Sequence, residues 1–152
     1  MSQTTTDRID KQILLRAPKS RVWRALTDAE EFGTWFRVKL NGRFFLGQSM
    51  RGNVTYPGYE HLSMELTVER MDTERLFSFR WHPYAADPKV DYSDEPTTLV
   101  EFRLKEASGG TLLTVTESGF DRIPAHRRAE AFRMNEQGWG MQMENIQRHV
   151  GG

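Results

Sequence analysis

Much of the chain alternates between apolar and polar residues, which is the period of strands in an antiparallel sheet with one covered face. Between Arg8 and Ala17 the isoleucines and Leu15 share one parity. Further alternating runs follow from Val38 to Thr116, separated by turn-forming pairs such as Asn41-Gly42 and Gly109-Gly110. The pattern predicts a first strand and, later in the chain, a six-stranded meander.

Three stretches have helical periodicity instead. Pro18 to Thr27 carries an apolar stripe, and Asp28 can cap a second short helix from Ala29 to about Phe36. After Pro124, apolar residues recur at steps of four and three along a helix of about 40 Å, long enough to cross the sheet. The predicted inward stripe, in which Glu136 is the exception, consists of Ala125, Ala129, Phe132, Glu136, Trp139, Met143, Ile146 and Val150.

The alternation stops between Pro83 and Thr97, in a segment rich in proline and acidic residues. Loops longer than about 12 residues in compact domains tend to be functional lids or mobile segments. We expect the segment from Pro83 to Pro96 to be mobile and to flank the entrance of a cavity. The basic cluster of Arg122, His126, Arg127 and Arg128 is expected to be a solvated face or a partner of this loop.

Composition narrows the choice of function. Twenty-one basic and 21 acidic residues balance, which argues against nucleic acid or an anionic membrane surface as a partner. No stretch approaches the length of a membrane span and the first ten residues are polar, so we expect a single cytoplasmic domain over residues 1–152 without membrane insertion. The chain has no cysteine, and its histidines lack the spacing of metal ligands, so neither a metal nor a cofactor is predicted.

Four motifs occur in order along the chain: residues 17–28 (APKSRVWRALTD), Trp35-Phe36, residues 116–120 (TESGF) and Gly138-Trp139. In this arrangement the sequence resembles the START-like (SRPBCC) superfamily, in the branch named after activators of the heat-shock-protein-90 ATPase. The resemblance covers nearly the whole chain. It implies an α+β helix-grip fold, in which a curved antiparallel sheet of six or seven strands surrounds the long C-terminal helix and two short helices follow the first strand.

The resemblance also implies an internal cavity for apolar or amphipathic molecules, and in some branches cyclase, hydrolase or dehydratase chemistry. Glu117 shares the parity of Leu113 and Val115, so its carboxyl group should point inward, where Glu136 could meet it. Two carboxylates in an apolar chamber can separate into a general acid and a general base. Alternatively, a bulge before Gly119 turns Glu117 outward and Glu136 reaches solvent.

The candidate ligand-binding residues are mostly aromatic or apolar side chains with inward parity, together with these two glutamates and Tyr56 as a polar partner. They are Trp35, Tyr56, Trp81, Phe102, Glu117, Phe132, Glu136, Trp139 and Met143. The alternative is that the apolar members are ordinary core. Gly138, inside the last helix, suggests close approach of the sheet or of a ligand, or else a kink.

The first hypothesis is a binding module without catalytic activity, whose internal cavity holds a small apolar or amphipathic molecule. The alternative is an enzyme of cyclase, hydrolase or dehydratase type with Glu117 or Glu136 as its catalytic candidates. A third is a chaperone-assisting domain. The eukaryotic co-chaperones carry an additional N-terminal domain, whereas this sequence begins a few residues before its first strand. A homodimer is left open.

Overall fold

The computed structural model describes residues 7–40, 42–87 and 89–151. The elements are, in order, β1 (Arg8–Leu15), α1 (Lys19–Thr27), α2 (Ala29–Phe36), β2 (Val38–Leu40), β3 (Ser49–Val54), β4 (Ser63–Asp72), β5 (Leu76–Trp81), β6 (Thr98–Ala107), β7 (Gly110–Ser118), the 3₁₀ turn η1 (Phe120–Arg122) and α3 (Ala125–Val150). The predicted helices are confirmed. The first strand ends at Leu15 rather than Ala17, because Pro18 caps α1.

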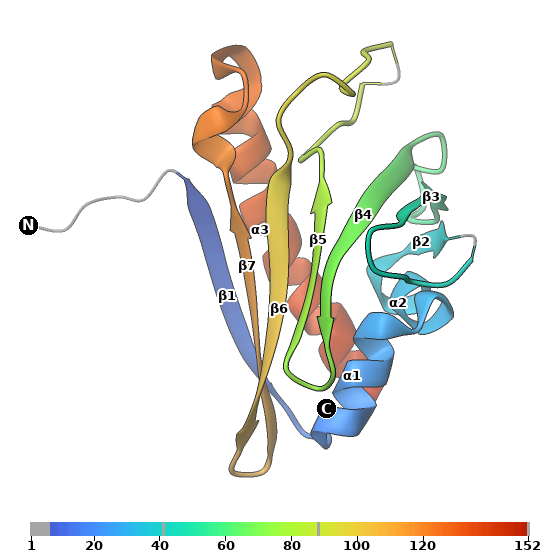
Figure 1. Ribbon diagram of the computed structural model, residues 1–152, viewed down its shortest axis with the longest axis vertical. Coiled ribbons are helices and arrows are strands. Elements are labelled where there is room, and N and C mark those ends of the chain that lie inside the picture. Colours follow the sequence, from blue (N-terminus) through green and yellow to red (C-terminus); the bar gives the residue numbers. More distant parts are fainter. Residues whose placement is uncertain (1–6, 41, 88, 152) are drawn as a thin grey trace, which may run out of the picture.

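The seven strands form one antiparallel sheet in the order β1-β7-β6-β5-β4-β3-β2. Strands β2 to β7 pair with their neighbours in sequence, and β1 adds to β7 as the opposite edge. Figure 1 shows α3 crossing behind the sheet, with α1 and α2 near its C-terminal half. This is the predicted α+β helix-grip architecture. Of the helices in the described part of the chain, none is long and apolar enough to span a membrane.

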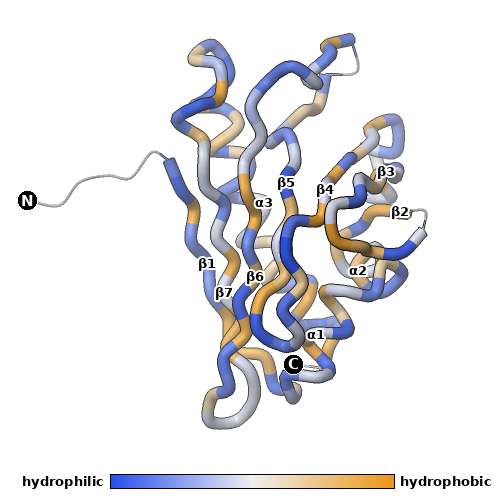
Figure 2. The backbone as a smooth tube through the Cα atoms, viewed as in Figure 1, coloured by the Kyte–Doolittle hydropathy of each residue, from blue (hydrophilic) through white to orange (hydrophobic). Residues whose placement is uncertain are grey.

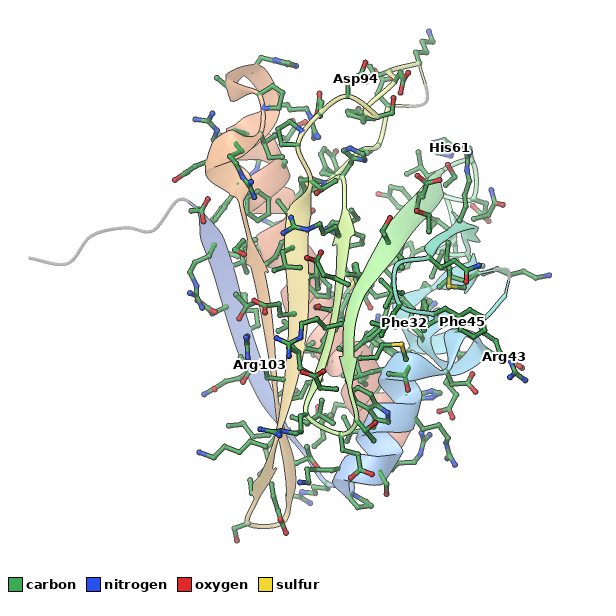
Figure 3. All side chains as sticks on the ribbon, viewed as in Figure 1. Phe32, Arg43, Phe45, His61, Asp94 and Arg103 are labelled. Carbon is green, nitrogen blue, oxygen red and sulfur yellow. The ribbon has the colours of Figure 1, made fainter. Side chains whose placement is uncertain are left out.

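Aromatic side chains fill the interior between the sheet and the helices. Phe32 from α2 and Phe77, Phe79 and Phe102 from the sheet are fully buried. Their rings contact one another at centroid distances of 6.0 to 6.4 Å. Apolar and polar stretches alternate along the strands (Figure 2), and Phe32 points into this interior (Figure 3). The part of the interior around these rings is therefore packed core.

The short helix α2 begins as predicted, because the Asp28 side chain accepts a hydrogen bond from the Glu31 N–H (3.0 Å). Gly33 then allows α2 to lie directly against β2. A Cβ atom at this position would come within 2.2 Å of the Val38 carbonyl oxygen, so no larger residue fits without moving the strand. This packing places Phe36, the last residue of α2, beside α3.

The inward line of α3 departs from the predicted stripe in its N-terminal half. Trp139, Met143, Ile146 and Val150 are buried as predicted, whereas Phe132 is only half-buried. Ala125, Ala129 and Glu136 are exposed, and Ala131 is buried in their place. A repeat of alternating three and four residues drifts by about 20° per heptad around a straight helix. The sheet beneath the helix also twists. The predicted stripe and the line of residues that faces the sheet therefore separate over several turns.

Candidate functional site

Glu117 lies on β7 with its side chain directed at α3, and it is fully buried. The strand stays in register at this point, with Ile9 on one side and Val100 on the other. Only at Gly119, after the strand ends, does the backbone take a positive φ of 105°. The inward direction predicted for Glu117 is thus confirmed, and the alternative of a bulge that turns it outward is wrong.

Four side chains donate hydrogen bonds to the Glu117 carboxylate. Oε1 accepts from Asn135 Nδ2 (2.9 Å) and Trp139 Nε1 (2.8 Å), both on α3. Oε2 accepts from Trp81 Nε1 (2.7 Å), at the end of β5, and from Thr98 Oγ1 (2.5 Å), at the start of β6. The carboxylate therefore joins three strands of the sheet to the helix.

Every donor around Glu117 is electrically neutral. An indole N–H can only donate, and an ionised carboxylate only accepts through about four lone-pair sites, so this environment suits the anion. None of the ion pairs between described residues involves Glu117. The site thus holds a buried carboxyl group with no charged partner, and each of its oxygens already has two hydrogen-bond partners.

The possible pairing of Glu117 with Glu136 is not formed, and the alternative that Glu136 reaches solvent is confirmed. Glu136 is exposed on α3. Successive residues of a helix point about 100° apart, so Asn135, one position earlier, has a different direction and makes the contact with Glu117. Tyr56 is also not a partner of Glu117: it is 39% exposed in the β3–β4 connection, where its ring contacts Tyr59 and Arg37.

A pocket of about 80 Å³ lies beside Glu117, between the end of α2, the end of β5 and the middle of α3. It is lined by Phe36, Trp81, Asn135, Gly138, Trp139 and Gln142. Its three aromatic rings contact one another, with centroids 5.8 to 6.0 Å apart. A pocket of this size has room for several water molecules, which suits an end group of a few heavy atoms rather than a whole polycyclic molecule.

Gly138 contributes empty space to this pocket. A Cβ atom added there would meet no atom within 4 Å, so close approach of the sheet is not the reason for the glycine. Gly140, two residues later, is equally unobstructed but does not line the pocket. A larger side chain would therefore fill the pocket at Gly138 but not at Gly140.

Among the predicted ligand-binding residues, only Trp81 and Trp139 line this pocket, and Glu117 lies behind them. The other inward-facing candidates belong to the core: Trp35, Phe102 and Met143 are buried, and half-buried Phe132 packs on Phe120. Phe36, Asn135 and Gln142 were not predicted. Phe36 belongs to the Trp35-Phe36 motif, and the two amides lie about one turn on either side of Trp139, so a signal for each was present in the sequence.

The segment from Pro83 to Pro96, here called the acidic loop, starts and ends at this site. Trp81 and Thr98, which flank it, are paired across β5 and β6 and both donate to Glu117. Farther out, Arg127 of α3 donates to Glu95 Oε1 (2.8 Å) and to the Pro83 carbonyl (2.8 Å), and it stacks over Tyr92. The expectation that the basic cluster partners the loop is confirmed for Arg127. Mobility of the loop stays a prediction.

A second set of charges joins the helices to one another. Glu31 of α2 accepts hydrogen bonds from Arg21 (2.7 Å) and Arg24 (2.7 Å) of α1 and lies 2.9 Å from His149 Nε2 of α3. Burial alone would raise the pKa of Glu31, but the hydrogen bonds from His149 and Arg21 and the arginine charges outweigh it and lower the pKa.

Within the described residues, no group of three or more histidine and acidic side chains could hold a metal ion.

Comparison with known proteins agrees with the fold described above. Residues 16–151 match the model of a family described as "Activator of Hsp90 ATPase homolog 1-like protein". No match was found among curated proteins. Similar solved structures include protein MLL2253 from Mesorhizobium loti, at 22% identity and a TM-score of 0.73, covering 94% of this chain and 96% of that one. Protein NE0264 from Nitrosomonas europaea has 18% identity, a TM-score of 0.74 and coverages of 99% and 97%. The Aha1 dimer from Colwellia psychrerythraea, solved in solution, has 13% identity, a TM-score of 0.71 and coverages of 94% and 95%.

Proposed function

Because the chain belongs to the family of Activator of Hsp90 ATPase homolog 1-like proteins, we propose that it is a binding module without catalytic activity. Its ligand is a small amphipathic molecule whose end group enters the pocket beside Glu117. The START-like fold, with a helix held against a curved sheet, is the setting in which such binding is expected.

The observation that carries this proposal is the lining of the pocket. Aromatic walls of Phe36, Trp81 and Trp139 combine with the amides of Asn135 and Gln142, and small-molecule sites typically have such apolar walls with few polar groups. Gly138 leaves the space open at a place where glycine lowers helix stability by about 1 kcal/mol relative to alanine. Trp81, Asn135 and Gln142 are half-buried, so a ligand can enter from the surface.

Two observations favour binding over the enzyme alternative. Both oxygens of Glu117 already accept two hydrogen bonds each, and general-base catalysis requires hydrogen-bond access to the proton of a substrate. The second carboxylate, that of Glu136, points into solvent. A chaperone-assisting role has no comparable support among the contacts described above.

A neutral amphipathic probe tests the proposal. We expect 3,3-dimethylbutan-1-ol, whose branched end suits the volume of the pocket, to shift the indole N–H signals of Trp81 and Trp139 in an NMR titration. Gly138→Leu fills the pocket and should abolish these shifts. Gly140→Leu makes the same change in the same helix outside the pocket and should retain them. Equal shifts in the Gly138→Leu and Gly140→Leu variants would contradict binding at this pocket.

We also propose that the chain forms a homodimer. The similar protein from Colwellia psychrerythraea is a dimer in solution. Here Phe45 and Leu46, in the connection between β2 and β3, are 55% and 64% exposed, and Figure 3 shows Arg43 of the same connection at the margin of the molecule. Light scattering should give twice the chain mass for the wild type and a single chain mass for a Phe45→Ser/Leu46→Ser variant. A monomeric wild type would refute the proposal.

A further inference from the structure

Glu117 places a negative charge directly behind the aromatic pocket. The carboxylate is fully buried, and the ion pairs among the described residues leave it without a cation. Two of its four donors, Trp81 and Trp139, are themselves walls of the pocket. In a medium of low dielectric constant the field of an ionised carboxylate is weakly screened, which favours a cation over an anion in the pocket.

The walls are suited to a cation in a second way. Phe36, Trp81 and Trp139 all line the pocket, and their rings contact one another with centroids 5.8 to 6.0 Å apart. An indole N–H bond lies in the plane of its ring, so donation to Glu117 uses the edge of each indole and not its faces. Several aromatic rings around one site are the arrangement that recognises quaternary ammonium groups. None of the six lining residues carries a charge that would repel a cation.

On the basis of the binding function proposed above, we infer that the end group of the ligand is an alkylated ammonium, such as trimethylammonium. The hydrogen-bonding sites of Glu117 are occupied and shielded from the pocket by the indoles, so a cation there cannot donate to the carboxylate. A primary ammonium would lose its hydrogen bonds to water without replacing them. A trimethylammonium group has no N–H to satisfy, its methyl groups contact the rings, and its size is that of a few heavy atoms.

A matched pair of probes isolates the charge. Choline and 3,3-dimethylbutan-1-ol have the same shape and differ in the charged nitrogen, and ethanolamine carries the charge without the methyl groups. In NMR or calorimetric titrations of the whole protein we expect choline to bind about tenfold more tightly than the neutral alcohol, in line with cation–π and buried-charge contributions. Ethanolamine should give no measurable binding.

Two variants connect the preference to the pocket. Phe36→Leu removes one ring without touching a donor of Glu117, so it should reduce the preference for choline severalfold while the alcohol binds nearly as before. Gly138→Leu should abolish the binding of both probes, and Gly140→Leu should change neither. The melting temperature of each variant shows whether it is folded.

The outcomes separate the two proposals. If both probes bind at the pocket with equal affinity, or if the alcohol binds more tightly, the ammonium inference is overturned and the binding function stands. If ethanolamine binds as well as choline, the requirement for alkylation is overturned. If neither choline nor the alcohol binds to the folded wild type, both proposals fail together.

Discussion

Replacing Glu117 by glutamine tests the four-donor arrangement directly, because an amide presents one oxygen and one NH₂ group. Asn135 and Thr98 can reverse their hydrogen bonds, the first by turning its amide and the second by rotating its hydroxyl group. The indoles of Trp81 and Trp139 cannot reverse theirs. Since one indole contacts each carboxylate oxygen, the new NH₂ group faces an indole N–H in either orientation.

The size of the effect follows from that geometry. At least one buried indole N–H loses its acceptor, and an unsatisfied buried donor costs about 1–3 kcal/mol. Loss of the buried charge weakens the remaining hydrogen bonds but also removes a desolvation penalty, so these two changes partly cancel. For a domain of this length, about 1–3 kcal/mol corresponds to a decrease in melting temperature of about 2–12 °C. Such a loss is smaller than the unfolding free energy of a typical domain, about 5–15 kcal/mol, so we expect the variant to fold.

Urea denaturation followed by far-ultraviolet circular dichroism measures the loss, with Glu136→Gln as the control. The control makes the same chemical change at an exposed position of α3 and should alter the unfolding free energy by less than about 0.5 kcal/mol. Trp139→Phe and Trp81→Phe remove one indole donor each, so one of them should cost less in the Glu117→Gln background than in the wild type. Equal stability of Glu117→Gln and Glu136→Gln, without such coupling, would refute the reasoning.

Three further predictions concern other parts of the molecule. Trp139→Ala should lower the unfolding free energy by about 3–5 kcal/mol; an unchanged urea midpoint would show that this side chain is not core. Arg127→Met should speed amide hydrogen exchange in the segment 83–96 while leaving β6 protected, and unchanged exchange there would contradict the anchoring role of Arg127. Because the pKa of Glu31 is lowered in the fold, its stabilisation is complete above the unfolded value of about 4.3 and is lost as pH falls through the lower folded value. Glu31→Gln should therefore be less stable at neutral pH and lose less stability below about pH 4; identical pH profiles would contradict this.

Parity along the strands indicated an inward direction for Glu117 but left a bulge at the strand end open, and the inward direction holds because β7 remains regular up to Ser118. The order of elements followed from equally local signals, such as the Asp28 cap and the turn-forming glycines. The residue of α3 that meets Glu117 could not be predicted in the same way. A shift of one residue rotates a side chain by about 100°, and the phase of the helix depends on the twist of the sheet on which it packs.

Contacts between distant segments also could not be predicted from the periodicity of the sequence. Arg127 could be expected near the acidic loop from charge alone, but its contact with the Pro83 carbonyl depends on the path of the loop backbone. The small size of the pocket depends on how the rings of Phe32, Phe77, Phe79 and Phe102 pack. Inward parity marks a side chain as interior, but it does not distinguish the wall of a pocket from the middle of a core.

The acidic loop leaves and re-enters the sheet at two residues, Trp81 and Thr98, that a buried carboxylate holds together from inside. Its length is therefore uncoupled from the position of the pocket walls. Peptide inserted near its tip, around the exposed residues Lys89 and Val90, would extend into solvent while both stems stay in place, as is typical of tolerated insertion sites. The protein thus carries a natural attachment point for added sequence next to its candidate binding site, where an inserted reporter or a second binding element would remain close to the ligand.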